Sequence, residues 1–159
     1  MRAKLHTTAQ RSALMKSVGR ANTAPEMAVR RYLHGLGFRY RVNVRGVPGT
    51  PDIVLPRFRT VVFVHGCFWH GHDCRHGAVA ARSNASYWHE KIAANRERDA
   101  RKARELRELG WFVEILFECQ VADTGVLKSF VTRVRPRFDP RYGAGAATNA
   151  VRRRSIALR

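Results

Sequence analysis

A short stretch rich in histidine and cysteine constrains the fold of this chain more than any other feature. Residues 64–74 read VHGCFWHGHDC, which places three histidines, two cysteines and two adjacent aromatic residues within eleven positions. Cysteine and histidine are preferred zinc ligands in proteins, and a tetrahedral site of four such ligands fixes the backbone around it. The rest of the domain must therefore fold so that any missing ligand lies beside this loop.

The third cysteine of the chain, Cys119, ends the apolar run WFVEILFEC. With Cys67, His72 and Cys74 it would complete a closed zinc site of three sulfur ligands and one nitrogen ligand. The spacing Cys-x4-His-x-Cys differs from the familiar Cys-x2-Cys pattern, and buried cysteines often act simply as small apolar residues. We favour zinc, because the site would use every cysteine of the chain.

The charge of the chain indicates its partner. The 159 residues include 30 Lys and Arg but only 12 Asp and Glu, which gives a net charge of +18, and 45% are hydrophobic, enough for the core of a single domain. Such an excess suits nucleic acid, with an anionic membrane surface as the rival. The chain has neither an apolar run near the roughly 18 residues of a membrane span nor a signal-peptide core. We therefore expect an intracellular nucleic-acid-binding protein.

The hydrophobic pattern predicts alternating helices and strands. A capping box at 23–26 starts a helix that glycines at 35 and 37 should end. Further helices are expected at 86–109, 126–134 and, more weakly, 8–18, and strands at 38–44, 53–55, 60–64 and 111–117. This order describes a mixed α/β or α+β domain. From 135 onward, proline, glycine and arginine indicate a loosely ordered basic tail.

Acidic residues and histidines outside the zinc set suggest hydrolytic chemistry. Asp52 and His65 are expected on adjacent strands, where a carboxylate could hold a divalent cation while His65 or His70 handles a proton. Asp99 falls on the apolar stripe of the long helix, where an unpaired acid is costly. Each acid also has an ordinary explanation: a turn for Asp52, the capping box for Glu26 and a helix salt bridge for Asp99.

Three aromatic residues have two possible uses. Phe68 and Trp69 lie within the zinc loop, and Trp88 begins the long helix. A loop fixed by zinc could hold these rings outward to stack on DNA bases. Alternatively, they could form a small hydrophobic cluster over the metal.

Taken together, these motifs resemble the very short patch repair (Vsr) endonucleases of bacteria. The matching motifs are PGTPDIV at 48–54, HGCFWHGHDC at 65–74, YWHEKI at 87–92 and LGWFVEILFEC at 109–119. The resemblance implies a restriction-endonuclease-like α/β core, with a mixed sheet flanked by helices and a structural zinc. It also implies an endonuclease that nicks double-stranded DNA 5′ of the thymine in a T:G mispair left by deamination of 5-methylcytosine.

The resemblance further assigns roles to individual residues. Asp52 would bind a catalytic Mg²⁺ with the backbone carbonyl of Val64, and His70 would be the general base, assisted by His65. Glu26 and Asp99 would organise metal-bound water. The Zn²⁺ ligands would be Cys67, His72, Cys74 and Cys119. The side chains inserted into the duplex would be Phe68, Trp69, Trp88 and Met15.

The same resemblance sets the expected organisation. Residues 1–135 would form one domain, with 1–20 clasping the DNA, and 136–159 would form the tail. We expect a monomer with mismatch-repair proteins as possible partners. It would act in the bacterial cytoplasm, associated with the nucleoid and without contact to a membrane. The alternatives are a related nicking nuclease with relaxed sequence context and a non-catalytic, zinc-stabilised DNA-binding module.

Overall fold

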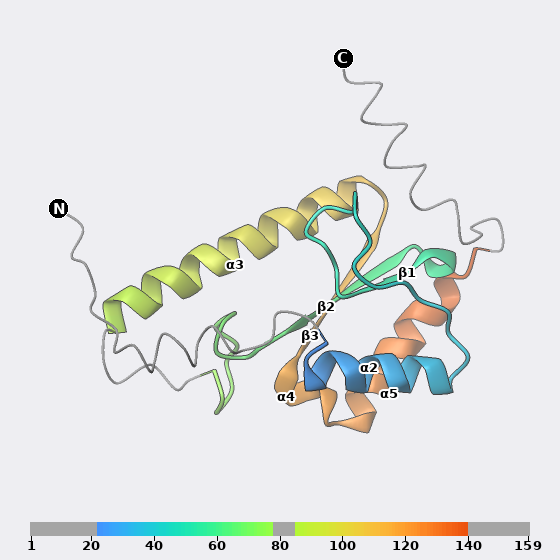
Figure 1. Cartoon of the computed structure of the whole chain (residues 1–159), viewed down its shortest axis with the longest axis horizontal. Helices are drawn as coiled ribbons and strands as arrows, with labels where there is room; N and C mark the ends of the chain where they lie inside the picture. The colour runs from blue at the N-terminus through green and yellow to red at the C-terminus, as the bar shows by residue number, and fades with distance from the viewer. Residues whose placement is uncertain (1–21, 78–84, 140–159) are drawn as a thin grey trace, which may run out of the picture.

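The computed structural model describes residues 22–77 and 85–139, which form a small sheet covered by helices (Figure 1). Met15 and the predicted clasp at 1–20 lie outside this range, as does the predicted helix at 8–18. The described elements are α2 (Ala24–Gly35), β1 (Ile53–Leu55), η1 (Pro56–Phe58), β2 (Thr60–His65), α3 (Ala85–Glu108), β3 (Phe112–Phe117), α4 (Glu118–Val121), α5 (Thr124–Val134) and η2 (Arg135–Arg137).

The three described strands form a mixed sheet in the order β1-β2-β3. β1 pairs with β2 in antiparallel fashion, with Ile53 opposite Val62, whereas β2 and β3 are parallel, with Thr60 opposite Phe112. The parallel pair needs a crossover, and α3 provides it. The predicted mixed α/β architecture is therefore confirmed.

Strand alternation gives the sheet two buried faces, each covered by helices. Leu55 and Val62 pack with α2 and α5, whereas Val54 and Val61 pack with α3. Figure 1 shows α3 on one side of the sheet and α2, α4 and α5 on the other. Because side chains alternate along a strand, His65, four residues after Val61, faces α3.

Most predicted elements are confirmed, but the strand expected at 38–44 is wrong. Only Arg41 pairs there, through an isolated bridge to Val54. Asn43 has a φ of +50°, which turns the chain away, and β1 is only three residues long and offers no further partner. Of the alternating apolar residues, Phe38 is buried and Tyr40 and Val44 are partly buried, whereas Val42 is exposed.

The first residues of the predicted tail pack against the domain. Phe138 makes an edge contact with Phe58 at 5.6 Å between ring centroids, and the Asp139 N–H donates to the Arg57 carbonyl at 2.6 Å. The Arg137 guanidinium lies 3.5 Å from the centroid of the Phe112 ring. Residues 137–139 thus contact the domain. Residues 140–159 lie outside the described residues, so the domain boundary after 135 stays a prediction.

Within residues 22–77 and 85–139, no helix has the length and apolar character needed to cross a membrane.

Candidate active site and metal centre

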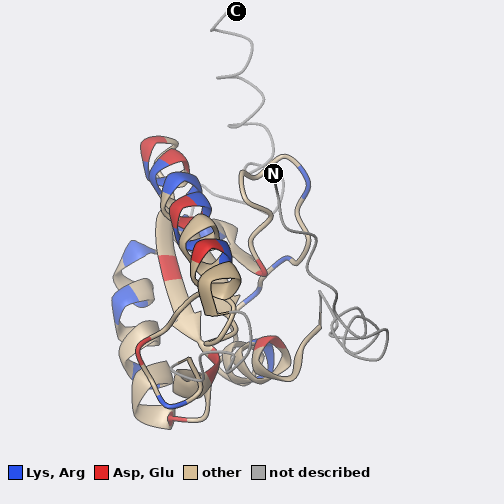
Figure 2. Ribbon diagram, turned by 90° about the vertical axis from the view of Figure 1, so that its left-hand side faces the viewer, with Lys and Arg blue, Asp and Glu red and all other residues tan. Residues whose placement is uncertain are grey.

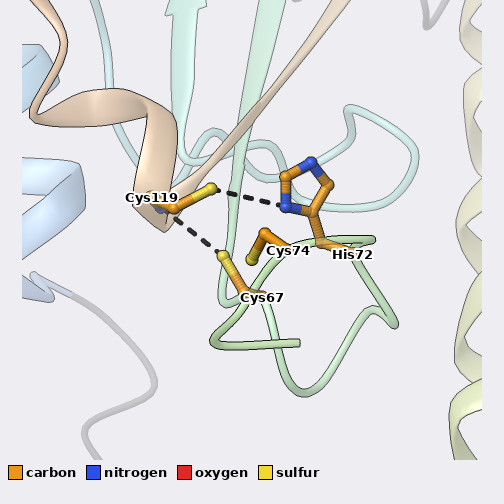
Figure 3. Close-up of side chains that lie close together, drawn as sticks. All are labelled: Cys67, His72, Cys74 and Cys119. Atoms are coloured by element: carbon orange, nitrogen blue, oxygen red, sulfur yellow. Dashed lines mark hydrogen bonds between the residues drawn. The ribbon is translucent and has the colours of Figure 1, made fainter. Parts of the chain in front are cut away.

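The predicted zinc ligands come together from two distant segments (Figure 3). Cys67, His72 and Cys74 lie in the loop after β2, and Cys119 lies at the start of α4. One ligand atom from each of the four lies within 4.8 Å of the others. A tetrahedral zinc with Zn–S bonds of about 2.3 Å places its sulfur ligands about 3.8 Å apart, so these four atoms are close enough to bind one such ion.

Hydrogen bonds and one ring contact hold this cluster together. The backbone N–H of Cys119 donates to the sulfur of Cys67 at 3.4 Å, and the Cys119 sulfur lies 3.4 Å from Nδ1 of His72. The His72 ring stacks on Phe117 with 4.0 Å between centroids. Because Phe117 ends β3, the core of the sheet orients the histidine.

A glycine allows the loop to approach α3 closely. Gly71 has a φ of +60°, and a Cβ there would lie 2.6 Å from Cγ2 of Ile92. Both the left-handed backbone and the contact penalise any larger residue. Asn95, one turn further along α3, donates to the carbonyl of Trp69 at 2.9 Å. α3 therefore holds the loop through both contacts.

We expect Gly71→Ala to lower the free energy of unfolding by about 2–3 kcal/mol, from backbone strain and overpacking. The matched control is Gly35→Ala at the end of α2, where a Cβ meets nothing within 4 Å. That change should be neutral or stabilising by up to about 1 kcal/mol. Urea denaturation measures both, and equal effects would contradict the close approach of the loop to α3.

A histidine–aspartate pair lies next to the Cys/His cluster. Nδ1 of His70 lies 2.5 Å from Oδ2 of Asp99, both side chains being about four-fifths buried. The His65 ring stacks on His70, with 3.7 Å between centroids and an angle of 10°. Burial, followed by the neighbouring His70, lowers the pKa of His65 to about 4, so His65 stays neutral near pH 7.

Asp99 thus has a more specific partner than sequence reasoning gave it. The ordinary explanation of Asp99 is a salt bridge with an arginine, and Arg98 does lie 3.7 Å from the other carboxylate oxygen. The shorter contact, however, is to His70. A carboxylate on Nδ1 fixes the ring orientation and leaves Nε2 free to take a proton.

Asp52 lies at the edge of the sheet, just before β1. Its Oδ2 accepts the backbone N–H of Val64 at 2.7 Å. Continuing the β1–β2 register puts Asp52 opposite Phe63 and hence on the face of the sheet that carries His65. Burial raises the pKa of Asp52 despite the Val64 hydrogen bond.

Glu26 does not form the predicted capping box. Its Oε1 accepts from the hydroxyl of Thr23, and its Oε2 accepts the backbone N–H of Asn22 and the guanidinium of Arg30. The Thr23 side chain caps no backbone N–H of α2. Sequence reasoning did not pair Arg30 with Glu26, although a position four residues later on the same helix predicts this contact.

The three aromatic residues form one cluster. Phe68, Trp69 and Trp88 meet edge to face, with ring centroids 5.1–5.8 Å apart. All three are half-buried, and Tyr87 extends the cluster outward. The rings therefore cover part of one another's surface, while part of each stays exposed.

Comparisons with known proteins agree with these motifs. The profile of the family described as DNA mismatch endonuclease Vsr matches residues 3–76. The chain is 48% identical over 131 residues to the type II nicking enzyme V.XorIIP of Xanthomonas oryzae pv. oryzae, covering 82% of this chain and 93% of the relative. It is 41% identical over 130 residues to the nicking enzyme V.NmeAIP of Neisseria meningitidis, covering 82% and 92%.

A third relative identifies the family. The chain is 43% identical to the DNA mismatch endonuclease Vsr of Escherichia coli K12 over 117 residues, which are 74% of each protein. By their names, these relatives form a class of DNA-cutting enzymes. The chain belongs to the DNA mismatch endonuclease Vsr family.

Proposed function

We propose that this chain is a DNA mismatch endonuclease with a restriction-endonuclease-like core, which uses Mg²⁺ to nick one strand 5′ of the thymine in a T:G mispair. The observation that carries the proposal is the His70–Asp99 pair, with Nδ1 and Oδ2 2.5 Å apart and the His70 ring stacked on His65 at the end of β2. Family membership supports the same activity. It would act as a monomer on nucleoid DNA in the bacterial cytoplasm, with mismatch-repair proteins as candidate partners.

The residues around Asp52 fit a magnesium ion. Oxygen is the ligand that Mg²⁺ prefers, usually from one or two carboxylates with water and phosphate completing the shell. Asp52 supplies such a carboxylate, of which Oδ2 accepts the Val64 N–H. The Val64 carbonyl points to the same edge of β2 as its N–H, which binds Asp52. Bound there, Mg²⁺ would supply positive charge against the phosphate and its leaving oxygen.

His70 is suited to act as the general base. With Nδ1 held by Asp99, its Nε2 can accept a proton from the attacking water, and the carboxylate stabilises the imidazolium that results. His65 stacks on His70 and is neutral near pH 7. It therefore places no second positive charge beside the imidazolium of His70. Asp99 therefore acts through His70 in this proposal and organises water only indirectly.

The charge of the chain supports DNA as substrate. α3 exposes six basic residues: Lys91, Arg96, Arg98, Arg101, Arg104 and Arg107. Figure 2 shows acidic residues between these basic residues along α3. Individual Lys and Arg side chains, rather than one continuous positive surface, would therefore bind the DNA phosphates. Phe68, Trp69 and Trp88 would insert beside the weakly stacked mispair.

Duplexes labelled on either strand test the proposed activity. With Mg²⁺, we expect a nick 5′ of the thymine in the T:G duplex, an intact guanine strand, and no product from the matched T:A duplex or with EDTA. A nick in any other strand or duplex favours the nuclease of relaxed context. Tight binding without a nick in any divalent ion favours the non-catalytic DNA-binding module.

The Cys/His cluster is proposed as a structural zinc site, and its loss should destabilise the domain. Structural zinc contributes on the order of 10 kcal/mol in small domains. His72→Ala should therefore remove the zinc and lower the melting temperature by more than about 10 °C. His76→Ala, in the same loop but exposed and outside the ligand set, should change neither.

Elemental analysis of protein purified under reducing conditions, combined with thermal melting, checks both variants. One zinc per chain is expected in the wild type and in His76→Ala. A wild-type protein without tightly held zinc would remove the zinc proposal.

A further inference from the structure

A buried arginine on α2 has no place in the chemistry proposed above. The Arg30 side chain is only 6% exposed, and its Nε lies buried without a hydrogen-bond partner among the described residues. Burying a guanidinium costs several kcal/mol before any partner is counted. Its neighbour Arg31 is exposed, so the charge of the chain does not explain this placement.

The guanidinium donates to four groups, one of which is the Met27 sulfur at 3.7 Å from Nη1. Nη1 donates to the side-chain oxygen of Asn22 at 2.6 Å, where the chain enters α2. Nη2 donates to Oε2 of Glu26 at 3.1 Å and to the backbone carbonyl of Asp52 at 3.3 Å. Glu26 is itself only 5% exposed in its side chain, so this pair is one of the most buried ionic contacts described.

Asp52 is consequently held from two sides. Arg30 binds its backbone carbonyl from α2, and the Val64 N–H binds its carboxylate from β2. Residue 52 lies just before β1, outside the ladder that begins at Ile53. Without Arg30, only the carboxylate contact and the chain itself would fix it.

We propose that Arg30 is a positioning residue: anchored by Glu26, it fixes the backbone of Asp52 so that the carboxylate meets the divalent ion. This inference rests on the proposed function of Asp52. It also gives Glu26 a different task from the one expected. The Glu26 carboxylate is occupied by Asn22, Thr23 and Arg30, and it orients the guanidinium instead of metal-bound water.

The rival explanation is that Arg30 only neutralises Glu26. The double variant Glu26→Gln/Arg30→Met separates the two, because it removes one charge of each sign and leaves the net charge unchanged. A neutralising role predicts that the double variant behaves like the wild type. A positioning role predicts that folding survives while metal binding weakens, because the bond to the Asp52 carbonyl is lost.

The test is titration of zinc-loaded protein with Mn²⁺, counting the free ion by electron paramagnetic resonance, together with thermal melting. We expect the Kd of the double variant for Mn²⁺ to rise about 3- to 10-fold, the equivalent of one hydrogen bond. The half-saturating Mg²⁺ concentration for nicking should rise by the same factor. Arg31→Met should match the wild type in every measurement.

Two further variants make the outcome decisive. Arg30→Lys keeps the charge beside Glu26 but loses the planar fork, so it too should weaken Mn²⁺ binding, even if the double variant fails to fold. Wild-type affinity in Arg30→Lys, or in a folded double variant, overturns the role of Arg30. Wild-type affinity in Asp52→Asn instead removes the metal site of the proposed function.

Discussion

Replacing His70 by alanine should lower the single-turnover rate of nicking by about 10²- to 10⁴-fold, the range that one general base contributes. The imidazole is the group whose Nδ1 is held by Asp99, and alanine leaves no proton acceptor in its place. DNA binding should persist, because the basic surface and the aromatic cluster are unchanged.

The control for this prediction is His89, which lies on α3 and is not paired with Asp99. His89→Ala removes an exposed imidazole from α3, the helix that carries Asp99, and should leave the rate unchanged. The nicking rate of Asp99→Asn should lie between the rates of His70→Ala and His89→Ala. An amide can still hydrogen-bond the His70 ring, but it cannot stabilise the imidazolium. A rate for His70→Ala within a few-fold of the wild type would assign proton transfer to another group.

The sequence predicts the framework of the fold because its signals are local. The apolar runs that became β1, β2 and β3, and the glycine-bounded helix α2, each follow from periodicity and turn residues. Segment 38–44 shows the limit of this reasoning. Its alternation matches a strand, but strand formation depends on a neighbour with free hydrogen-bonding groups, which periodicity cannot supply.

The site was predictable in its residue types but not in its contacts. Cys119 could be assigned to the zinc set because no other cysteine remained. The inward position of Asp99 also followed from helix geometry, but its partner His70 is 29 residues away, and only the packing of α3 on the loop brings them together. The pair of Arg30 with Glu26 follows from helical spacing, but the contact of Arg30 with the Asp52 carbonyl spans 22 residues and depends on how α2 packs beside the sheet.

Asp52 carries the central claim, that a carboxylate at the edge of the sheet holds the ion used for strand cleavage. Asn is nearly isosteric, and its amide oxygen can still accept the Val64 N–H, so Asp52→Asn should fold as the wild type does. The change removes the charge that binds the metal, which contributes several kcal/mol to the transition state, or about 10³-fold in rate.

The most direct measurement is single-turnover nicking of a T:G duplex by Asp52→Asn at saturating protein and Mg²⁺, with melting temperature and DNA affinity measured on the same sample. We expect a folded protein that binds the duplex normally and nicks it about 10³-fold more slowly. Nicking at the wild-type rate by this variant would contradict the account.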